Sequence, residues 1–135
     1  MKQDYAARAR AFVGVRFRPQ GRIPELGLDC VGLMMCTFGL PSNLARNDYR
    51  LRGRHLGELL AGLGGPFRRL PRKSARSGDV LVLRVAPEQW HLAIVTGRGL
   101  VHADAKIGKV VETAGPPDWP VIAVFRRRSR VQGQS

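Results

Sequence analysis

The second half of the chain carries short apolar runs, rich in branched residues, that are separated by turn signals of Gly, Asp and Ser. These runs have the length of strands and cover 80–85, 91–96, 100–104, 109–112 and 121–125. Apolar residues at helical spacing cover 4–13, 30–38 and 55–63. Helices followed by a series of strands predict an α+β domain in which the N-terminal helices pack on an antiparallel sheet.

One domain accounts for the chain. Its 135 residues, 44% of them hydrophobic, suffice for one core. We expect a single domain over 1–130 and a flexible polar tail over 131–135. No apolar run approaches the ~20 residues of a membrane-spanning helix, and residues 1–5 lack the apolar core of a secretory signal. We therefore expect a protein that is cytoplasmic as synthesised, without membrane insertion, and that acts elsewhere only if a carrier delivers it.

Basic residues give the chain a formal net charge of +13, from 23 Lys and Arg against 10 Asp and Glu. Such a charge attracts polyanions. The basic residues are nevertheless dispersed, and only 126–130 forms a dense run. No zinc finger, helix-turn-helix or RNA-binding aromatic pattern accompanies them. We expect a solvated basic surface and no specific binding of nucleic acid; a nucleic-acid-binding protein is an alternative that rests on charge alone.

Cys30 opens the apolar run 30–38, which Gly39 ends, and Asp29 stands directly before it as a helix cap. In the first turn of a helix, unpaired backbone amides and the helix dipole favour a thiolate, so we expect a lowered pKa for Cys30. Cys36 lies inside the run and is predicted to be a small buried hydrophobe. Cysteines six apart on a helix point to nearly opposite sides, so no disulfide between them is expected.

His91 and His102 fall on consecutive predicted strands across a tight turn, which can bring them within reach of each other. Thiol hydrolysis needs an imidazole base and a third polar group that orients it. Packing of the helix on the sheet would set Cys30 opposite His91, which predicts a thiol hydrolase; Asp104, on the same strand face as His102, is a second candidate for the orienting group. No CxxC pair or Cys/His cluster has zinc spacing, so no metal or cofactor is expected.

Six short segments together resemble the NlpC family of bacterial cell-wall cysteine peptidases. In family order they are 13–18, 29–33 around the nucleophile, 78–81 at the start of a strand, 91–95 around the base, 101–103 and 108–112. The resemblance spans about residues 5–125. It implies a papain-like fold in which Cys30 is the nucleophile, His91 the general base and His102 the residue that orients it, with no metal.

The resemblance also implies a substrate. Family members typically cut amide bonds in peptidoglycan stem peptides, often between D-glutamate and the diamino acid. Asp29, Phe17 and Trp90 are candidates for substrate contacts, with core packing as the alternative for Trp90 and for Trp119. Phe17 stands where many family members carry a Tyr whose hydroxyl faces the active site.

Small family members without a signal peptide also occur in phage tails and gene-transfer particles. The expected partners are therefore the peptidoglycan stem peptide and, in such a setting, phage-tail or particle proteins. A close variant of the enzyme hypothesis is an amidase of the related CHAP type. The alternative from another class is a structural or assembly component of a phage-like particle that keeps the fold with weak or no activity, and Phe17 is its main support.

Overall fold

A computed structural model describes residues 4–40 and 56–129. The irregular segment expected over 42–54, the start of the helix expected at His55, and the tail expected over 131–135 lie outside the described residues. The described helices and strands follow the predicted order, helices first and strands afterwards.

The helices begin and end at local signals. Their bounds are α1 Tyr5–Arg10, α2 Cys30–Phe38 and α3 Leu56–Leu63. Asp29 caps α2 by accepting a hydrogen bond from the Gly32 amide, and Gly39 ends it in the left-handed conformation (φ 63°) that glycine adopts readily. α1 ends three residues earlier than predicted, because turns replace the helix after Arg10.

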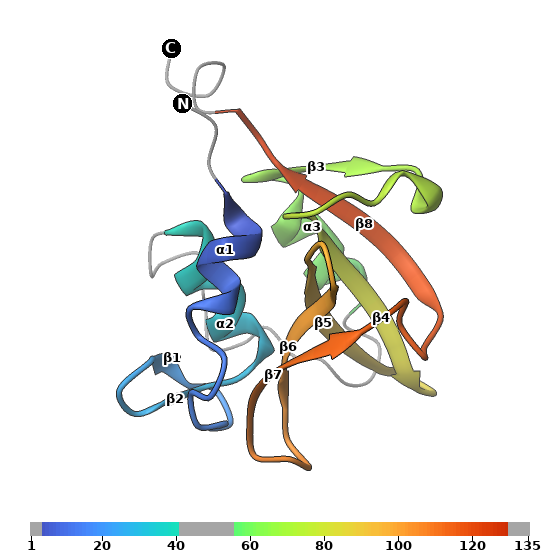
Figure 1. Cartoon of the computed structure of the whole chain (residues 1–135). Coiled ribbons are helices and arrows are strands. Elements are labelled where there is room, and N and C mark those ends of the chain that lie inside the picture. The colour runs from blue at the N-terminus through green and yellow to red at the C-terminus, as the bar shows by residue number, and fades with distance from the viewer. Residues whose placement is uncertain (1–3, 41–55, 130–135) are drawn as a thin grey trace.

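Six antiparallel strands form the main sheet in the order β3-β8-β4-β5-β6-β7. Their bounds are β3 Phe67–Leu70, β4 Val80–Ala86, β5 Gln89–Val95, β6 Gly99–Asp104, β7 Lys109–Ala114 and β8 Val121–Arg127. A separate antiparallel pair, β1 (Arg22–Ile23) and β2 (Gly27–Leu28), precedes α2, and a 3-10 turn, η2 (Arg72–Ser74), follows β3. Figure 1 shows α1 and α2 together beside the sheet, next to the β1–β2 pair.

The two faces of the sheet bury different side chains, as alternation along each strand requires. Val80 and Val82 of β4 belong to the core cluster that also contains the apolar side of α2. Leu81 and Leu83, the alternate residues, belong to a second buried cluster with Leu100 of β6. None of the helices among the described residues is long and apolar enough to cross a membrane.

Part of the dense basic run is structural, which corrects the expectation of a merely solvated surface. Arg126 forms an ion pair with Asp79, a carboxylate that is only 2% exposed, at 2.7 Å. The side chains of Arg127 and Arg128 donate to the carbonyls of Pro66 and Gly65. These bonds attach β8 to the segments on either side of β3 and η2. The spacing of charges along the sequence gives no sign of them, since the partners lie more than 45 residues away.

Candidate active site

Asp29 organises the backbone around Cys30, the first residue of α2. Its carboxylate accepts from the Gly32 amide at 2.8 Å and from the Gln20 amide at 2.9 Å. It also forms an ion pair with the Arg22 guanidinium at 2.7 Å. One side chain therefore caps the helix and holds the preceding loop against it, so the backbone of Cys30 is fixed from both sides.

Two glycines allow this close approach. A Cβ on Gly32 would overlap the carbonyl of Gly21, and a Cβ on Gly21 would overlap the carbonyl of Gly27. The β1–β2 segment therefore packs backbone to backbone on the first turn of α2, where no side chain fits. The glycine two residues after Cys30 is needed for this packing.

The Cys30 thiol is buried, with 4% of the residue exposed. Burial, followed by the negative charge of Asp29, raises its pKa to about 12. A hydrogen bond from the Leu92 backbone, the charge of Arg22 and the amide of Cys30 itself act in the opposite direction. The expected lowering of this pKa is therefore wrong, because desolvation and the adjacent carboxylate outweigh the helix start. In this state Cys30 is a neutral thiol that needs a base.

Leu92, which lies in the same buried cluster as Cys30, is beyond the paired part of β5 and β6, which pair only at Ile94–Val101 and Val95–Leu100. The Val95 amide donates to the Asp79 carbonyl on the β4 side. Amides alternate in direction along a strand, so the Leu92 amide, three residues earlier, points away from β4. At Leu92 the pairing of β5 with β6 has already ended. The opening between these strands leaves the Leu92 amide free to meet the start of α2, directly beside His91.

His91 and His102 contact each other. The distance from His91 Nε2 to His102 Nδ1 is 3.0 Å, and the two rings are edge to face at 88°. In the register Ile94–Val101 the two residues are not directly opposite each other. Their side chains meet on a diagonal where the strands have separated. Trp119 completes the cluster, with its ring centroid 6.1 Å from each imidazole.

Both imidazoles are neutral at neutral pH. Burial, followed by the charge of His102, lowers the pKa of His91 to about 4, and burial also lowers the pKa of His102. The hydrogen bond between His91 Nε2 and His102 Nδ1 contains one proton, so one of these nitrogens donates and the other accepts. If His91 Nε2 donates it, His91 Nδ1 carries a free lone pair and can accept a proton from a thiol. His102 then fixes the tautomer of His91.

Asp104, the second candidate for orienting His91, has other partners. Its Oδ1 accepts from the amides of Lys106 and Ile107, at 2.8 and 2.9 Å, in the turn after β6. The described hydrogen bonds place His102, and not Asp104, on His91. Between Cys30 and His91 themselves, the described residues show no hydrogen bond.

The three proposed substrate contacts have different surroundings. Asp29 is occupied by the bonds described above. Phe17 is half-buried against the main core, and its amide donates to the Gly108 carbonyl. Trp90 is 5% exposed within the core, and the Arg84 guanidinium lies 5.0 Å from its ring centroid, so core packing describes it. A role of any of the three in substrate binding stays a prediction.

Several features near Cys30 have no signal in the sequence. Nothing in the spacing of the sequence pairs Arg22 with Asp29. Cys36 is half-buried rather than buried, and its Sγ donates to the Arg22 carbonyl at 3.6 Å, so the expectation of a simple hydrophobe is wrong. The Leu92 amide leaves no trace in the sequence, because its availability depends on where the strands separate.

The charges of Asp29 and Arg22 act in opposite directions on the pKa of Cys30, so their removal should have opposite effects. Asp29→Asn keeps an oxygen for the helix cap but removes the negative charge, so the pKa of Cys30 should fall. Arg22→Gln removes the positive charge, so that pKa should rise further. A shift of half a pKa unit changes the thiolate fraction by about threefold. The alkylation rate of Cys30 at pH 9, in a Cys36→Ala background, should therefore increase in the first variant and decrease in the second. A change of the same sign in both would contradict this.

The lowered pKa of His91 also predicts how stability depends on pH. Between about 4, its folded value, and its ordinary value of 6.5, the unfolded chain binds more protons than the folded one. The free energy of unfolding should therefore fall as pH is lowered through this range, by about 2 kcal/mol for this group at pH 4.5. Urea denaturation at pH 7 and 4.5 measures the loss. In His91→Gln most of that difference should disappear; an unchanged difference would assign it to other groups.

Among the described residues, no three His, Cys, Asp or Glu side chains form a group that could hold a metal ion. A scan against protein-family models finds no match, and a search of curated proteins finds none. Solved structures do match. The NlpC/p60 domain of the peptidoglycan hydrolase SagA is similar with a TM-score of 0.57 and 20% identity, covering 82% of this chain and 86% of that one.

The peptidoglycan hydrolase RipB from Mycobacterium tuberculosis is similar with a TM-score of 0.58 and 20% identity. This match covers 92% of the present chain, which spans 62% of the RipB chain. The chain therefore has the α+β fold of NlpC/p60 domains, which confirms the predicted fold class.

Proposed function

We propose that the protein is a cysteine peptidase that hydrolyses amide bonds in peptidoglycan stem peptides. The observation that carries the proposal is the His91–His102 pair, 3.0 Å apart, beside the strand amide that meets Cys30 at the start of α2. The shared fold supports the substrate class, because both similar structures are peptidoglycan hydrolases. A thiol, a base and an orienting group are the parts that thiol hydrolysis requires.

The reaction begins with two neutral partners. His91 Nδ1 takes the proton of the Cys30 thiol while the sulfur attacks the carbonyl carbon of the stem peptide. The amides of Cys30 and Val31, at the start of α2, stabilise the resulting oxyanion, whereas the Gly32 amide is held by the Asp29 cap. The protonated His91 then gives its proton to the leaving amine as the carbon–nitrogen bond breaks, which leaves a thioester on Cys30.

Water completes the cycle. His91 takes a proton from water, the hydroxide attacks the thioester carbonyl, and the sulfur leaves with the proton that His91 returns. His102 keeps the imidazole of His91 in one orientation throughout. The high pKa of the resting thiol suits this order, because the thiolate forms only as it attacks.

We also propose that the bond that is cut joins D-glutamate to the diamino acid. A phage-tail or gene-transfer particle would deliver the protein to the wall. Both rest on the family resemblance. The exposed side chains of Arg16 and Arg18, on the loop that leads to Cys30, are candidates to meet the carboxylates of the stem peptide. A solvated loop is the alternative for them.

Digestion of purified peptidoglycan tests the proposal. The wild-type protein should release fragments whose masses reflect the addition of one water per cut bond, with a new amino group on the diamino acid. Mass spectrometry of the fragments identifies the bond. The absence of fragments from walls of several chemotypes would contradict the proposal and favour the inactive structural component.

A further inference from the structure

We infer that a basic surface at one edge of the sheet binds an anionic wall polymer of the poly(polyol phosphate) type, apart from the active site. The inference rests on the proposed function for the choice of partner. The surface, called here the β3 basic patch, consists of six exposed side chains: Arg68, Arg69, Arg72, Lys73, Arg76 and Arg128.

Among the described residues, no carboxylate forms an ion pair with the β3 basic patch. Residues 64–78 contain no Asp or Glu, and five of the nine residues over 68–76 are basic. Asp79, the next carboxylate, is buried and takes both of its ion-pair contacts from Arg126. The charge of the patch therefore faces solvent without a carboxylate partner from this segment, although Arg128 also donates to the carbonyls of Gly64 and Gly65.

The arrangement carries a structural cost. Arg68 of β3 lies directly opposite Arg126 of β8, and like charges at opposed positions destabilise a strand pair. Charged residues on an edge strand protect against pairing with other chains, and one or two would suffice for that. Here the charges continue past β3 through η2 to Arg76. Protection of the edge therefore does not account for the patch.

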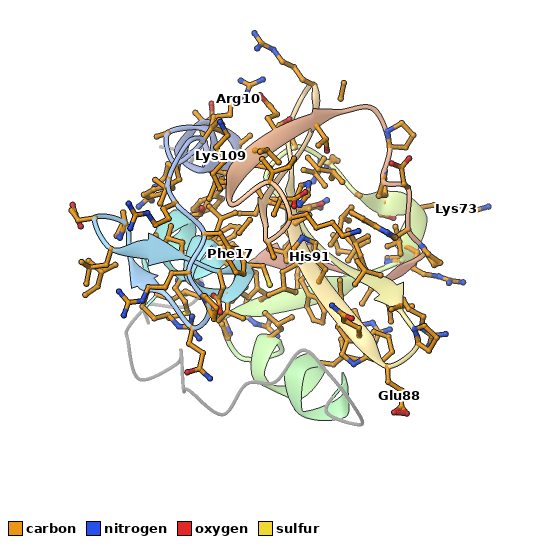
Figure 2. The ribbon with its side chains drawn as sticks, turned by 90° about the horizontal axis from the view of Figure 1, so that it is seen from below. Arg10, Phe17, Lys73, Glu88, His91 and Lys109 are labelled. Atoms are coloured by element: carbon orange, nitrogen blue, oxygen red, sulfur yellow. The ribbon has the colours of Figure 1, made fainter. Side chains whose placement is uncertain are left out.

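The β3 basic patch is distant from the histidine pair. β3 is the outer strand of the sheet, and β8 and β4 lie between it and β5, which carries His91. Three strand spacings amount to about 14 Å. Lys73 projects outward at the periphery, away from His91 near the centre of the view (Figure 2). A polymer can therefore bind the patch while a stem peptide occupies the site.

The composition of the patch favours phosphodiester groups. Guanidinium groups bind phosphate oxygens in pairs, and five of the six side chains are Arg. The segment offers no aromatic side chain for stacking on bases, because its one aromatic residue, Phe67, is fully buried. A flexible chain of phosphates without bases fits this surface, and such polymers belong to the layer in which a peptidoglycan hydrolase works.

A charge-matched pair of variants tests the inference. The patch variant replaces Arg69, Arg72, Lys73 and Arg76 with Gln. The control variant replaces Arg8, Arg98, Lys106 and Lys109 with Gln, all exposed and outside β3 and η2. Binding to purified poly(glycerol phosphate), and separately to a DNA duplex with the same number of phosphates, is measured from 50 to 200 mM salt. Circular dichroism and thermal unfolding check that each variant folds.

The patch variant should lose at least about tenfold in affinity for poly(glycerol phosphate), and its salt slope should fall by about 3 for four lost phosphate contacts. The control variant should stay close to wild type. Equal losses in both variants would overturn the inference in favour of a general charge effect. Tighter, patch-dependent binding of DNA would assign the surface to nucleic acid instead, and absence of wild-type binding at 150 mM salt would also overturn it.

Hydrolysis assays on two kinds of wall distinguish a failure of this inference from a failure of the proposed function. On polymer-free peptidoglycan the patch variant should cut at the wild-type rate, and on walls that carry the polymer it should cut more slowly. If the wild type cuts neither wall, the proposed function fails while the binding result still decides the inference. Equal cutting of both walls by wild type and patch variant would overturn a role of the patch in hydrolysis.

Discussion

Cys30→Ala is expected to lower the rate of stem-peptide hydrolysis by at least about 10⁴-fold, because it removes the thiol that would form the acyl intermediate. Cys36→Ala is the matched control. Its thiol lies six residues further along α2 and contacts the Arg22 carbonyl, so its loss should change the rate little. Release of a stem-peptide fragment, followed by chromatography, measures both variants.

The two cysteine variants also test whether the effect is chemical. Both should unfold within a few degrees of the wild type, since each change removes one sulfur atom from the same helix. Substantial hydrolysis by Cys30→Ala, or an equal loss in the Cys36 variant, would show that α2 does not carry the nucleophile.

His91→Ala is expected to lower the rate by about 10³-fold, because the neutral thiol of Cys30 then lacks its base. The raised pKa of Cys30 makes this loss large at neutral pH and smaller as the pH is increased, since hydroxide supplies more thiolate. A pH–rate profile from 6 to 10 measures the effect. His55→Ala, the remaining histidine variant, should leave the profile unchanged.

The wild-type profile has a predicted acid limb. His91 is active only when neutral, and its pKa is lowered to about 4, so activity should persist well below pH 6 and fall as the pH approaches 4. Loss of activity centred near 6.5 would mean that His91 titrates like an exposed histidine. A His91→Ala rate that does not recover with pH would mean that His91 has a role other than that of a base.

Local signals made α2 predictable. Asp29 before an apolar run and Gly39 after it are capping residues, and α2 begins and ends where they indicate. The strands of the second half were predictable in the same way, because turn residues separate them. β3 was missed, since an edge strand of four residues with two arginines shows neither alternation nor an apolar run.

The meeting of His91 and His102 follows from a tight turn between two apolar runs, which the sequence shows. The geometry of their contact cannot be predicted from the sequence, because it depends on where β5 and β6 separate. The sign of the Cys30 pKa shift was wrong for a related reason. A helix start near Asp29 suggests a thiolate, but burial by distant segments decides the outcome. Desolvation is a property of the packed molecule and leaves no local pattern.

The most direct test of the account is to locate the covalent bond that a stem-peptide analogue forms with the protein. The analogue carries a chloromethyl ketone in place of the scissile amide, and peptide mapping by mass spectrometry locates the adduct. We predict one adduct, on Cys30, whose extent matches the loss of hydrolysis and which does not form after Cys30→Ala. An adduct on Cys36, or hydrolysis that survives complete labelling of Cys30, would contradict the assignment of Cys30 as the nucleophile.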